Sequence, residues 1–255
     1  DLSHGLVEAA SERLRASGCE VRFGARVTDV LVRRGRLVGL VVGDREEIRI
    51  AQAILAPGQS ADDTLQRLRE RGVALAPKAF AVGLRVEHPQ ALIDEIQYGP
   101  WRSHPALPPA EYALTARLAK DDRSVYTFCM CPGGRVIACS AAAGGVITNG
   151  MSLSRRDGAY ANSAVVVNVR TEDFAPDPDD PLAGLAFRRL WEARAFAVAG
   201  GAYRAPAQRL TDFLVRRVSP DIPETTFRPG VTPVPLHEVL PRFVGASLVE
   251  GLRAF

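Results

Sequence analysis

The sequence predicts an α/β fold that passes into an α+β fold in its second half, and three observations support this class. Residues 1–56 have the pattern of a helix, a strand, three short antiparallel strands and a continuous apolar run. Several segments after residue 78 alternate between apolar and polar side chains, as half-buried strands do. Apolar residues over 182–197 recur with the helical period. At 255 residues and 47% hydrophobic composition, the chain can bury a sizeable core in one large or two small domains.

The first 77 residues should form a helix, a strand at 19–23 and a small antiparallel meander. The expected meander strands are 27–33, 36–42 and 47–50. The apolar run at 53–56 is typical of a strand buried on both faces of a parallel sheet. It ends at Pro57-Gly58, and a polar helix over 61–71 should follow.

From residue 78 onward, the pattern changes to a mixed sheet with helices. The expected strands are 79–87, 112–117, 125–131, 136–140, 145–148 and 163–171. The expected helices are a helical turn at 89–96, the long helix at 182–197 and two short helices within 236–255, after a Pro-rich loop. We therefore divide the chain into residues 1–77, residues 78–215 and a final segment, residues 216–255, of loop and helices leading back to the first domain.

Composition excludes several classes of protein. The net charge is only +3 and the basic residues are spread along the chain, which argues against nucleic-acid binding. No apolar run reaches the length that spans a membrane, and the N-terminus is not a signal peptide. The four cysteines (Cys19, Cys129, Cys131 and Cys139) form neither a disulfide framework nor a zinc site, so we expect no metal and a reducing, cytoplasmic location.

The segment Tyr126–Ser140 (YTFCMCPGGRVIACS) contains the most unusual combination of residues. In a regular strand, Cys129 and Cys131 would face the same side. Pro132-Gly133-Gly134 should then stop the strand and allow the backbone to approach another group closely. This pattern indicates a loop that closes over a flat ligand. Free cysteines are also among the most buried residue types, so plain core packing of both thiols is the equal alternative.

Other candidate residues each have a structural alternative. Asn149-Gly150 suits a hairpin turn as well as a site, and Met151 suits core packing. Arg155 and Arg156 resemble a solvated turn, with binding of an acidic substrate as the alternative. Arg85, Glu87 and His88 lie at a strand end, where functional residues are frequent, although a lone histidine is more often structural than catalytic.

Several stretches together resemble the bacterial FAD-dependent dehydrogenases of the NAD(P)/FAD-dependent oxidoreductase superfamily. The similarity runs in order along nearly the whole chain, and its most specific parts are the FCMCPGG and NGMS stretches. The matching stretches are Leu55–Ser60, Lys78–Pro89, Phe128–Gly134, Asn149–Ser152, Ala161–Ala164, Pro181–Gly184, Ala205–Gln208 and Asp212–Leu214.

The resemblance implies a FAD-dependent oxidoreductase that transfers a hydride between flavin and a small molecule. Residues 1–77 would be part of the FAD-binding domain, with a parallel strand and a meander, and residues 78–215 would be a mixed-sheet substrate domain. FAD would be contacted by Gly58, Gln59, Ser60, Pro132, Gly133 and Gly134, the last two through backbone N–H groups. Substrate would be contacted by Asn149, Met151, Arg155 and Asn162. Catalytic candidates are Cys129, Cys131 and Asn149.

The chain also departs from this family. No GxGxxG phosphate-binding segment is present, the later glycine-rich flavin segment is missing, and Gln59 and Asp62 replace the usual His and Arg. We therefore expect the middle part of such a flavoprotein, whose partners are its own missing N- and C-terminal segments. FAD binding by this chain alone is doubtful on this basis. The alternative is a non-catalytic binding or structural module. Open sheet edges also predict self-association of the isolated chain.

Overall fold

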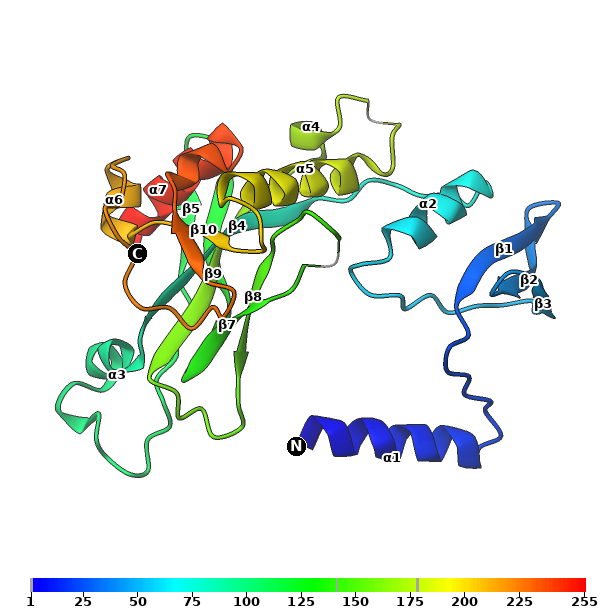
Figure 1. The fold of residues 1–255 in the computed structure, drawn as a ribbon, viewed down its shortest axis with the longest axis horizontal. Coiled ribbons are helices and arrows are strands. Elements are labelled where there is room, and N and C mark those ends of the chain that lie inside the picture. Colours follow the sequence, from blue (N-terminus) through cyan, green and yellow to red (C-terminus); the bar gives the residue numbers. More distant parts are fainter. Residues whose placement is uncertain (1, 141, 178) are drawn as a thin grey trace. The chain divides into compact units, whose positions relative to one another are not determined.

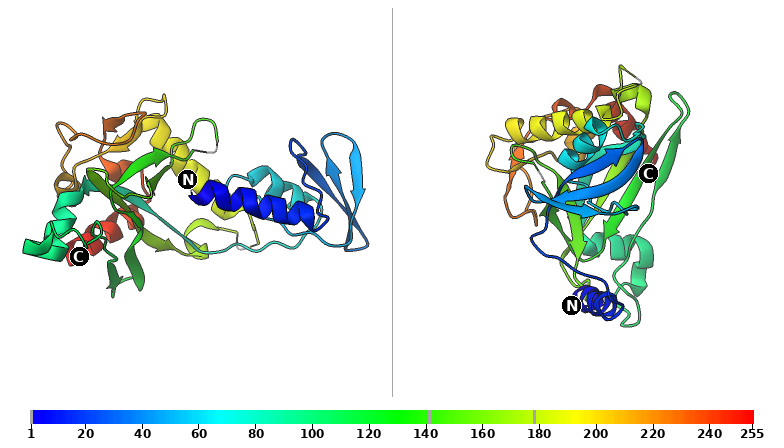
Figure 2. Two further views of the ribbon diagram at one scale, coloured as in Figure 1. Left: turned by 90° about the horizontal axis from the view of Figure 1, so that it is seen from below. Right: turned by 90° about the vertical axis from the view of Figure 1, so that its right-hand side faces the viewer.

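The computed structural model describes residues 2–140, 142–177 and 179–255 (Figure 1). Contacts divide the chain into two compact units, residues 1–75 and 76–255. The first unit contains two helices, α1 (Leu2–Ala16) and α2 (Asp62–Glu70). Its strands are β1 (Val27–Arg33), β2 (Arg36–Val42) and β3 (Glu46–Arg49). They pair antiparallel in the order β1-β2-β3 and lie side by side in both views of Figure 2, so the predicted meander is confirmed.

Two predicted strands of the first unit are wrong. Residues 19–23 and 53–56 are not strands, and Ile54 and Leu55 are 97% and 54% exposed. A strand of a parallel sheet obtains its backbone hydrogen bonds and its cover from neighbouring strands. Among the described residues, no strand pairs with the run at 53–56. The parallel pairing of this chain lies instead in the second unit, between β10 (Ala205–Ala207) and β11 (Val231–Pro233).

The second unit is built on a four-stranded antiparallel sheet in the order β4-β9-β6-β5. Its strands are β4 (Phe80–Pro89), β5 (Thr115–Leu118), β6 (Arg123–Cys131) and β9 (Tyr160–Val169). The strand β9 pairs with β4 along its whole length, from Phe80↔Val169 to Pro89↔Tyr160. On its other side β9 pairs with β6, so this central strand fixes the register of the sheet.

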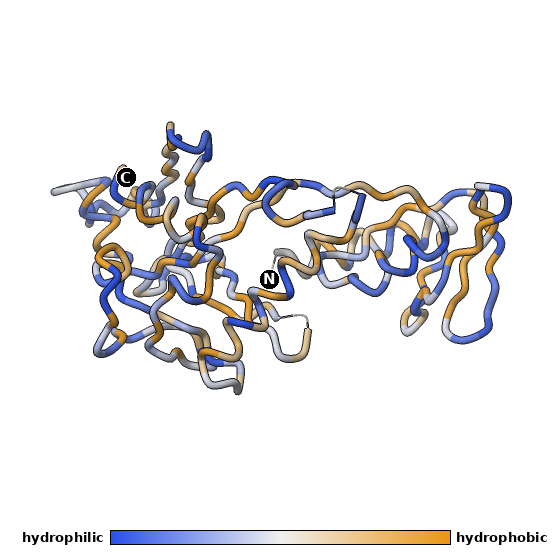
Figure 3. Tube along the Cα trace, turned by 90° about the horizontal axis from the view of Figure 1, so that it is seen from above, coloured by the Kyte–Doolittle hydropathy of each residue, from blue (hydrophilic) through white to orange (hydrophobic). Residues whose placement is uncertain are grey.

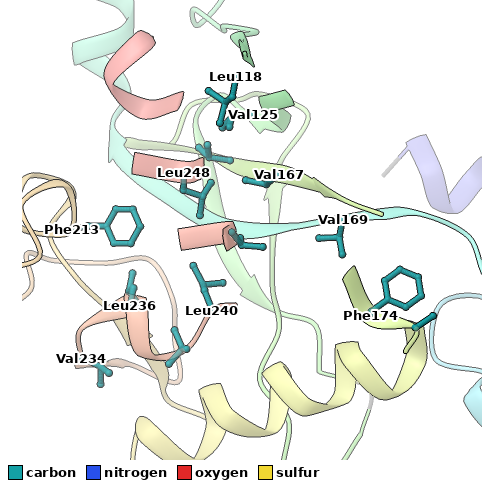
Figure 4. Close-up of a cluster of buried hydrophobic side chains, with 14 of the residues drawn as sticks. Leu118, Val125, Val167, Val169, Phe174, Phe213, Val234, Leu236, Leu240 and Leu248 are labelled. Carbon is teal, nitrogen blue, oxygen red and sulfur yellow. The ribbon is translucent and has the colours of Figure 1, made fainter. Parts of the chain in front are cut away.

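One face of this sheet is covered by α7 (Arg242–Ala254). Val125 and Val167 of the sheet lie with Leu248 of the helix in one buried cluster (Figure 4). Val165 and Val244 belong to the same cluster. A Cβ on Gly251 would lie 2.5 Å from the Cβ of Val125, so the close approach of α7 to β6 requires a glycine at this position. The final segment of the chain thus contributes to the core of the second unit. That residues 1–77 are part of a FAD-binding domain stays a prediction.

The remaining elements surround this sheet. They are α3 (Gln90–Tyr98), η1 (Gly99–Trp101), β7 (Gly134–Ala138), β8 (Thr148–Ser152), α4 (Thr171–Phe174), α5 (Ala183–Val198), α6 (Leu210–Leu214) and η2 (Leu236–Glu238). The pair β7–β8 is antiparallel and packs on a second, smaller core that includes Val136, Val146 and Phe227. Figure 3 shows polar and apolar residues interspersed along the helices. In the described part of the chain, no helix is long and apolar enough to cross a membrane.

Candidate functional site

The second face of the β4-β9-β6-β5 sheet carries the candidate site. Side chains alternate between the two faces of a sheet, so the neighbours of the buried valines point away from α7. Six of them, Ala81, Gly83, Arg85, Phe128, Ala164 and Val166, are the residues that we call the open face. By the same alternation, Ser124, Tyr126 and Asn168 point to this side of the sheet. Arg85, Ala164 and Phe128 form one row across three strands. All six are partly or largely accessible, and Phe128 is 63% exposed, so the open face offers an accessible surface with apolar side chains next to Arg85.

A polar cluster lies at the end of this surface. Arg85 Nη1 donates to Asn162 Oδ1 at 2.7 Å, and Arg85 Nη2 donates to Asn149 Oδ1 at 3.3 Å. Asn162 is completely buried, whereas Asn149 is exposed. A Cβ on Gly150 would overlap Asn162 Oδ1 and lie 2.6 Å from Arg85 Nη1. The glycine of the NGMS stretch therefore provides the space in which these three polar side chains meet.

The two cysteines of the FCMC stretch do not face the same side, so that prediction is wrong. The register between β6 and β9 shifts between Phe128 and Cys131, which marks a β-bulge. Cys129 has a φ of 51°, and its side chain is exposed, whereas Cys131 is buried and its Sγ donates to the Cys129 carbonyl at 3.4 Å. The extra residue of the bulge breaks the alternation on which the prediction rested.

Cys131 is placed as a packing residue and not as a reactive thiolate. Burial raises the pKa of its thiol, and the neighbouring Cys129 acts in the same direction, while Arg85 lowers it by less. The Cys131 thiol therefore stays protonated at neutral pH, and a reactive cysteine needs the opposite. Cys129 is the accessible thiol of the pair.

The Pro132-Gly133-Gly134 turn is confirmed, and its backbone is already engaged. The N–H of Gly133 donates to Gln90 Oε1 at 2.8 Å, and its carbonyl accepts from Gly158 N at 3.2 Å. All three turn residues are buried, and a Cβ on Gly133 would overlap the Arg156 carbonyl oxygen. The expected donation from Gly133 N–H to a ligand is thus replaced by a contact within the protein.

Among the predicted substrate contacts, Asn149 and Asn162 lie together in the cluster. Asn149 and Met151 are on β8, so the hairpin-turn alternative for Asn149-Gly150 is wrong. Met151 is 55% exposed, so core packing does not explain it. The predicted turn at Arg155 is present and exposed, and Arg156 forms an exposed ion pair of 3.6 Å with Glu111.

The predicted cofactor residues Gly58, Gln59 and Ser60 belong to the first unit. All three are exposed, and Gly58 has a φ of 77°, a conformation that suits glycine. Their role toward FAD stays a prediction.

A second polar pair, His88 and Tyr112, lies on the same unit, and of the two only His88 was a candidate from the sequence. His88 Nε2 and Tyr112 Oη are 2.8 Å apart, and both side chains are half-buried. Burial lowers the pKa of His88 and raises the pKa of Tyr112, so both are neutral at pH 7. His88 could be noted from its place at a strand end. Tyr112 begins the strand expected at 112–117, although β5 starts only at Thr115, and nothing local in the sequence links this tyrosine to His88.

Glu87 has a structural role. Its carboxylate accepts hydrogen bonds from Thr225 Oγ1 at 2.6 Å and from Thr226 N at 3.1 Å, which ties β4 to the loop before β11.

Nowhere in residues 2–140, 142–177 and 179–255 do three or more His, Cys, Asp or Glu side chains gather as a metal site.

Comparisons with known proteins identify the family of this chain. The family described as FAD-dependent protein, C-terminal domain-like, matches residues 79–255, which include the whole open face and its polar cluster. A protein of Clostridium beijerinckii, whose printed name is "Uncharacterized protein", is 40% identical over 257 residues. That alignment covers 100% of this chain and 48% of the relative, so the chain spans about half the length of the curated relative it matches.

Proposed function

Because this chain belongs to the family of FAD-dependent proteins, we propose that its second unit forms the substrate side of a FAD-dependent oxidoreductase. In this proposal the open face lines the space where a small molecule meets the flavin. The open face is the observation that carries the proposal: one side of the sheet is sealed by α7, and the other is accessible and has a polar cluster at its end. A flat, polar-edged ligand fits such a surface.

The side chains of the open face fit an isoalloxazine ring and a substrate beside it. Gly83 and Ala164 are small enough to let a flat ring approach the sheet, and Phe128 offers an apolar surface that excludes water. When bound, the flavin supplies the hydride chemistry, and the protein supplies position and electrostatics. Arg85 and Asn149 would orient a polar group at the end of this surface.

Other parts of the proposal concern the cofactor contacts and the compartment. The exposed turn at Gly58, Gln59 and Ser60 supports a contact with FAD from the first unit. The buried Pro132-Gly133-Gly134 turn supports the bulge that presents Cys129. In the described part of the chain, no disulfide joins Cys19, Cys129, Cys131 or Cys139, which supports a reducing, cytoplasmic location.

The direct test is the flavin content of the purified full-length protein. We expect a visible flavin absorption band and stoichiometric release of FAD on denaturation. We also expect Phe128→Ala to slow flavin reduction by substrate, whereas Glu250→Ala, on the exposed side of α7, leaves it unchanged. A full-length protein that takes up no flavin contradicts the proposal and favours the alternative, a non-catalytic binding module.

A further inference from the structure

We propose that Arg85, oriented by Asn149 and Asn162, binds the carboxylate of the substrate. This inference rests on the proposed function and goes one step further, because it names the chemical class of the substrate. It starts from the surroundings of the guanidinium group. Both of its hydrogen-bond acceptors are neutral carboxamide oxygens.

No carboxylate neutralises this cation among the described residues. The ionisable groups that affect its pKa are Cys131, Cys129 and Tyr112, and none of these is a carboxylate. Burial lowers the pKa of Arg85, so the protein pays a cost to keep a charge in this position. A partly buried cation without a counter-ion is suited to an anion that comes from outside.

Arg123, a buried arginine of the same unit, shows how this fold neutralises a structural cation. Arg123 donates to both carboxylate oxygens of Asp173, at 2.8 Å and 2.6 Å, and to the Asn168 carbonyl at 2.8 Å. Its charge is thus fully neutralised within the fold. Arg85 lacks such a partner, so packing alone does not account for it.

The cluster is also short of hydrogen-bond acceptors. Arg85 Nε and Asn162 Nδ2 are both buried and have no partner. Asn162 is completely buried, so its free amide is held inside the protein next to the cation. Unpartnered buried donors are rare in folded proteins and call for a specific explanation. A bound carboxylate adds two acceptor oxygens at this place.

The two partners of the Arg85 guanidinium differ in their exposure to solvent. Asn162 is completely buried and Asn149 is exposed, so we infer that a ligand reaches the guanidinium from the Asn149 end. Next to Arg85 in the same row of the sheet are Ala164 and the exposed Phe128. A carboxylate held by Arg85 and Asn149 would therefore place its carbon skeleton over an apolar surface. The substrate class that fits is a small carboxylic acid with an apolar body.

The test compares benzoate with benzamide, which has the same shape and no charge. Both are titrated into the full-length protein, and binding is measured by isothermal titration calorimetry and by the change in the flavin absorption band. We expect benzoate to bind and benzamide to bind at least about tenfold more weakly, since charge-assisted hydrogen bonds are lost. Absence of benzoate binding to the wild-type protein overturns the proposal.

Three variants and one control test whether the charge that binds benzoate is that of Arg85. Arg85→Met should weaken benzoate binding by about tenfold or more, and Arg85→Lys should keep part of it. Asn162→Asp places an internal carboxylate beside the guanidinium and should also abolish benzoate binding while the protein stays folded. Arg242→Met removes an exposed arginine at the start of α7 and should change nothing. Equal benzoate binding by wild type and Arg85→Met contradicts the proposal.

The same variants distinguish a substrate anion from the flavin itself. If Arg85→Met loses FAD while benzoate binding to the remaining holoprotein is unchanged, Arg85 serves the cofactor and the proposal is wrong. If the wild-type protein carries no flavin but calorimetry still detects benzoate binding that depends on Arg85, the carboxylate site stands and the oxidoreductase proposal fails.

Discussion

Arg85 donates a hydrogen bond of 2.7 Å to Asn162, yet these residues are 77 positions apart and lie on strands at the edge and in the centre of one sheet. Their meeting depends on the antiparallel register of β4 and β9, in which Glu87 faces Asn162 and Arg85 faces Ala164. The polar cluster is therefore a product of sheet register, and changes that shift this register should disturb it.

Gly150→Ala should disrupt the cluster directly. The added methyl group would overlap Asn162 Oδ1 and lie 2.8 Å from Cys131 Sγ. We expect a loss of about 1–3 kcal/mol in unfolding free energy, as for other overpacked cores, together with weaker benzoate binding. Urea unfolding measures the first effect. Met151→Ala, at the exposed neighbouring position, is the matched control and should leave the unfolding free energy nearly unchanged.

Gly251→Ala should destabilise the second unit although alanine favours helices. Alanine is better than glycine in a helix by about 1 kcal/mol, but here its Cβ would lie 2.5 Å from Val125 Cβ. The expected net effect is a lower unfolding free energy, by about 1–3 kcal/mol. In Gly245→Ala the nearest atom is His237 Nδ1 at 3.2 Å, so a smaller effect is expected. Equal effects of the two substitutions would count against close packing of α7 on β6.

The pair Arg123–Asp173 should contribute to acid sensitivity. The hydrogen bonds from Arg123 lower the pKa of Asp173 below its ordinary value of 3.8. Stabilisation by this pair is therefore fully present at neutral pH and is lost as pH falls through the lowered folded pKa. Asp173→Asn should cost about 2–4 kcal/mol at pH 7 and reduce the difference between unfolding free energies at pH 7 and pH 3.

Asp122→Asn is the control for this prediction. Asp122 forms an ion pair of 2.7 Å with Arg117, and both side chains are well exposed, at 66% and 77%. Exposed pairs contribute little, so the unfolding free energy at pH 7 should change by less than about 1 kcal/mol. If both substitutions have the same effect, burial of the Arg123–Asp173 pair is not the cause.

Thiol labelling should distinguish the two exposed cysteines from the buried one. A maleimide added to the native protein should modify Cys19 and Cys129 first, because both are exposed. Cys131 should react slowly, since it is buried and its pKa is raised. Mass spectrometry of digests after short reaction times identifies the modified residues. Rapid modification of Cys131 at neutral pH would contradict its placement as a packing residue.

Self-association of the isolated chain stays a prediction, and the structure offers a way to test it. Ile54 is 97% exposed, and Phe23 is 82% exposed, so large apolar side chains of the first unit are accessible. We expect light scattering to show species larger than a monomer, and Ile54→Asp to reduce them. A monomer alone at high protein concentration would contradict the prediction of self-association.

Patterns of local origin could be predicted from the sequence. The meander, α5 and the turn at Pro132-Gly133-Gly134 all follow from short-range periodicity and turn chemistry. The bulge at Cys129 could not be predicted, because it arises where β6 meets β9, far away in the sequence. The same reason applies to the polar cluster. Asn149 and Asn162 were candidates on their own, but their link to Arg85 depends on strand pairing.

The strand expected at 53–56 shows that a local pattern can predict an element that does not form. Its apolar residues have the right pattern, but a buried strand exists only when neighbouring strands pair with it. Local sequence describes the preference of a segment and not the presence of its partners.

If the open face lies next to the flavin, a tryptophan placed on it should quench flavin fluorescence. In the full-length protein, Phe128→Trp introduces an indole on the open face, and Glu250→Trp introduces one on the exposed side of α7, across the sheet. We expect a shorter flavin fluorescence lifetime in Phe128→Trp and an unchanged lifetime in Glu250→Trp. Unchanged lifetimes in both variants, or stronger quenching from α7, would contradict this expectation.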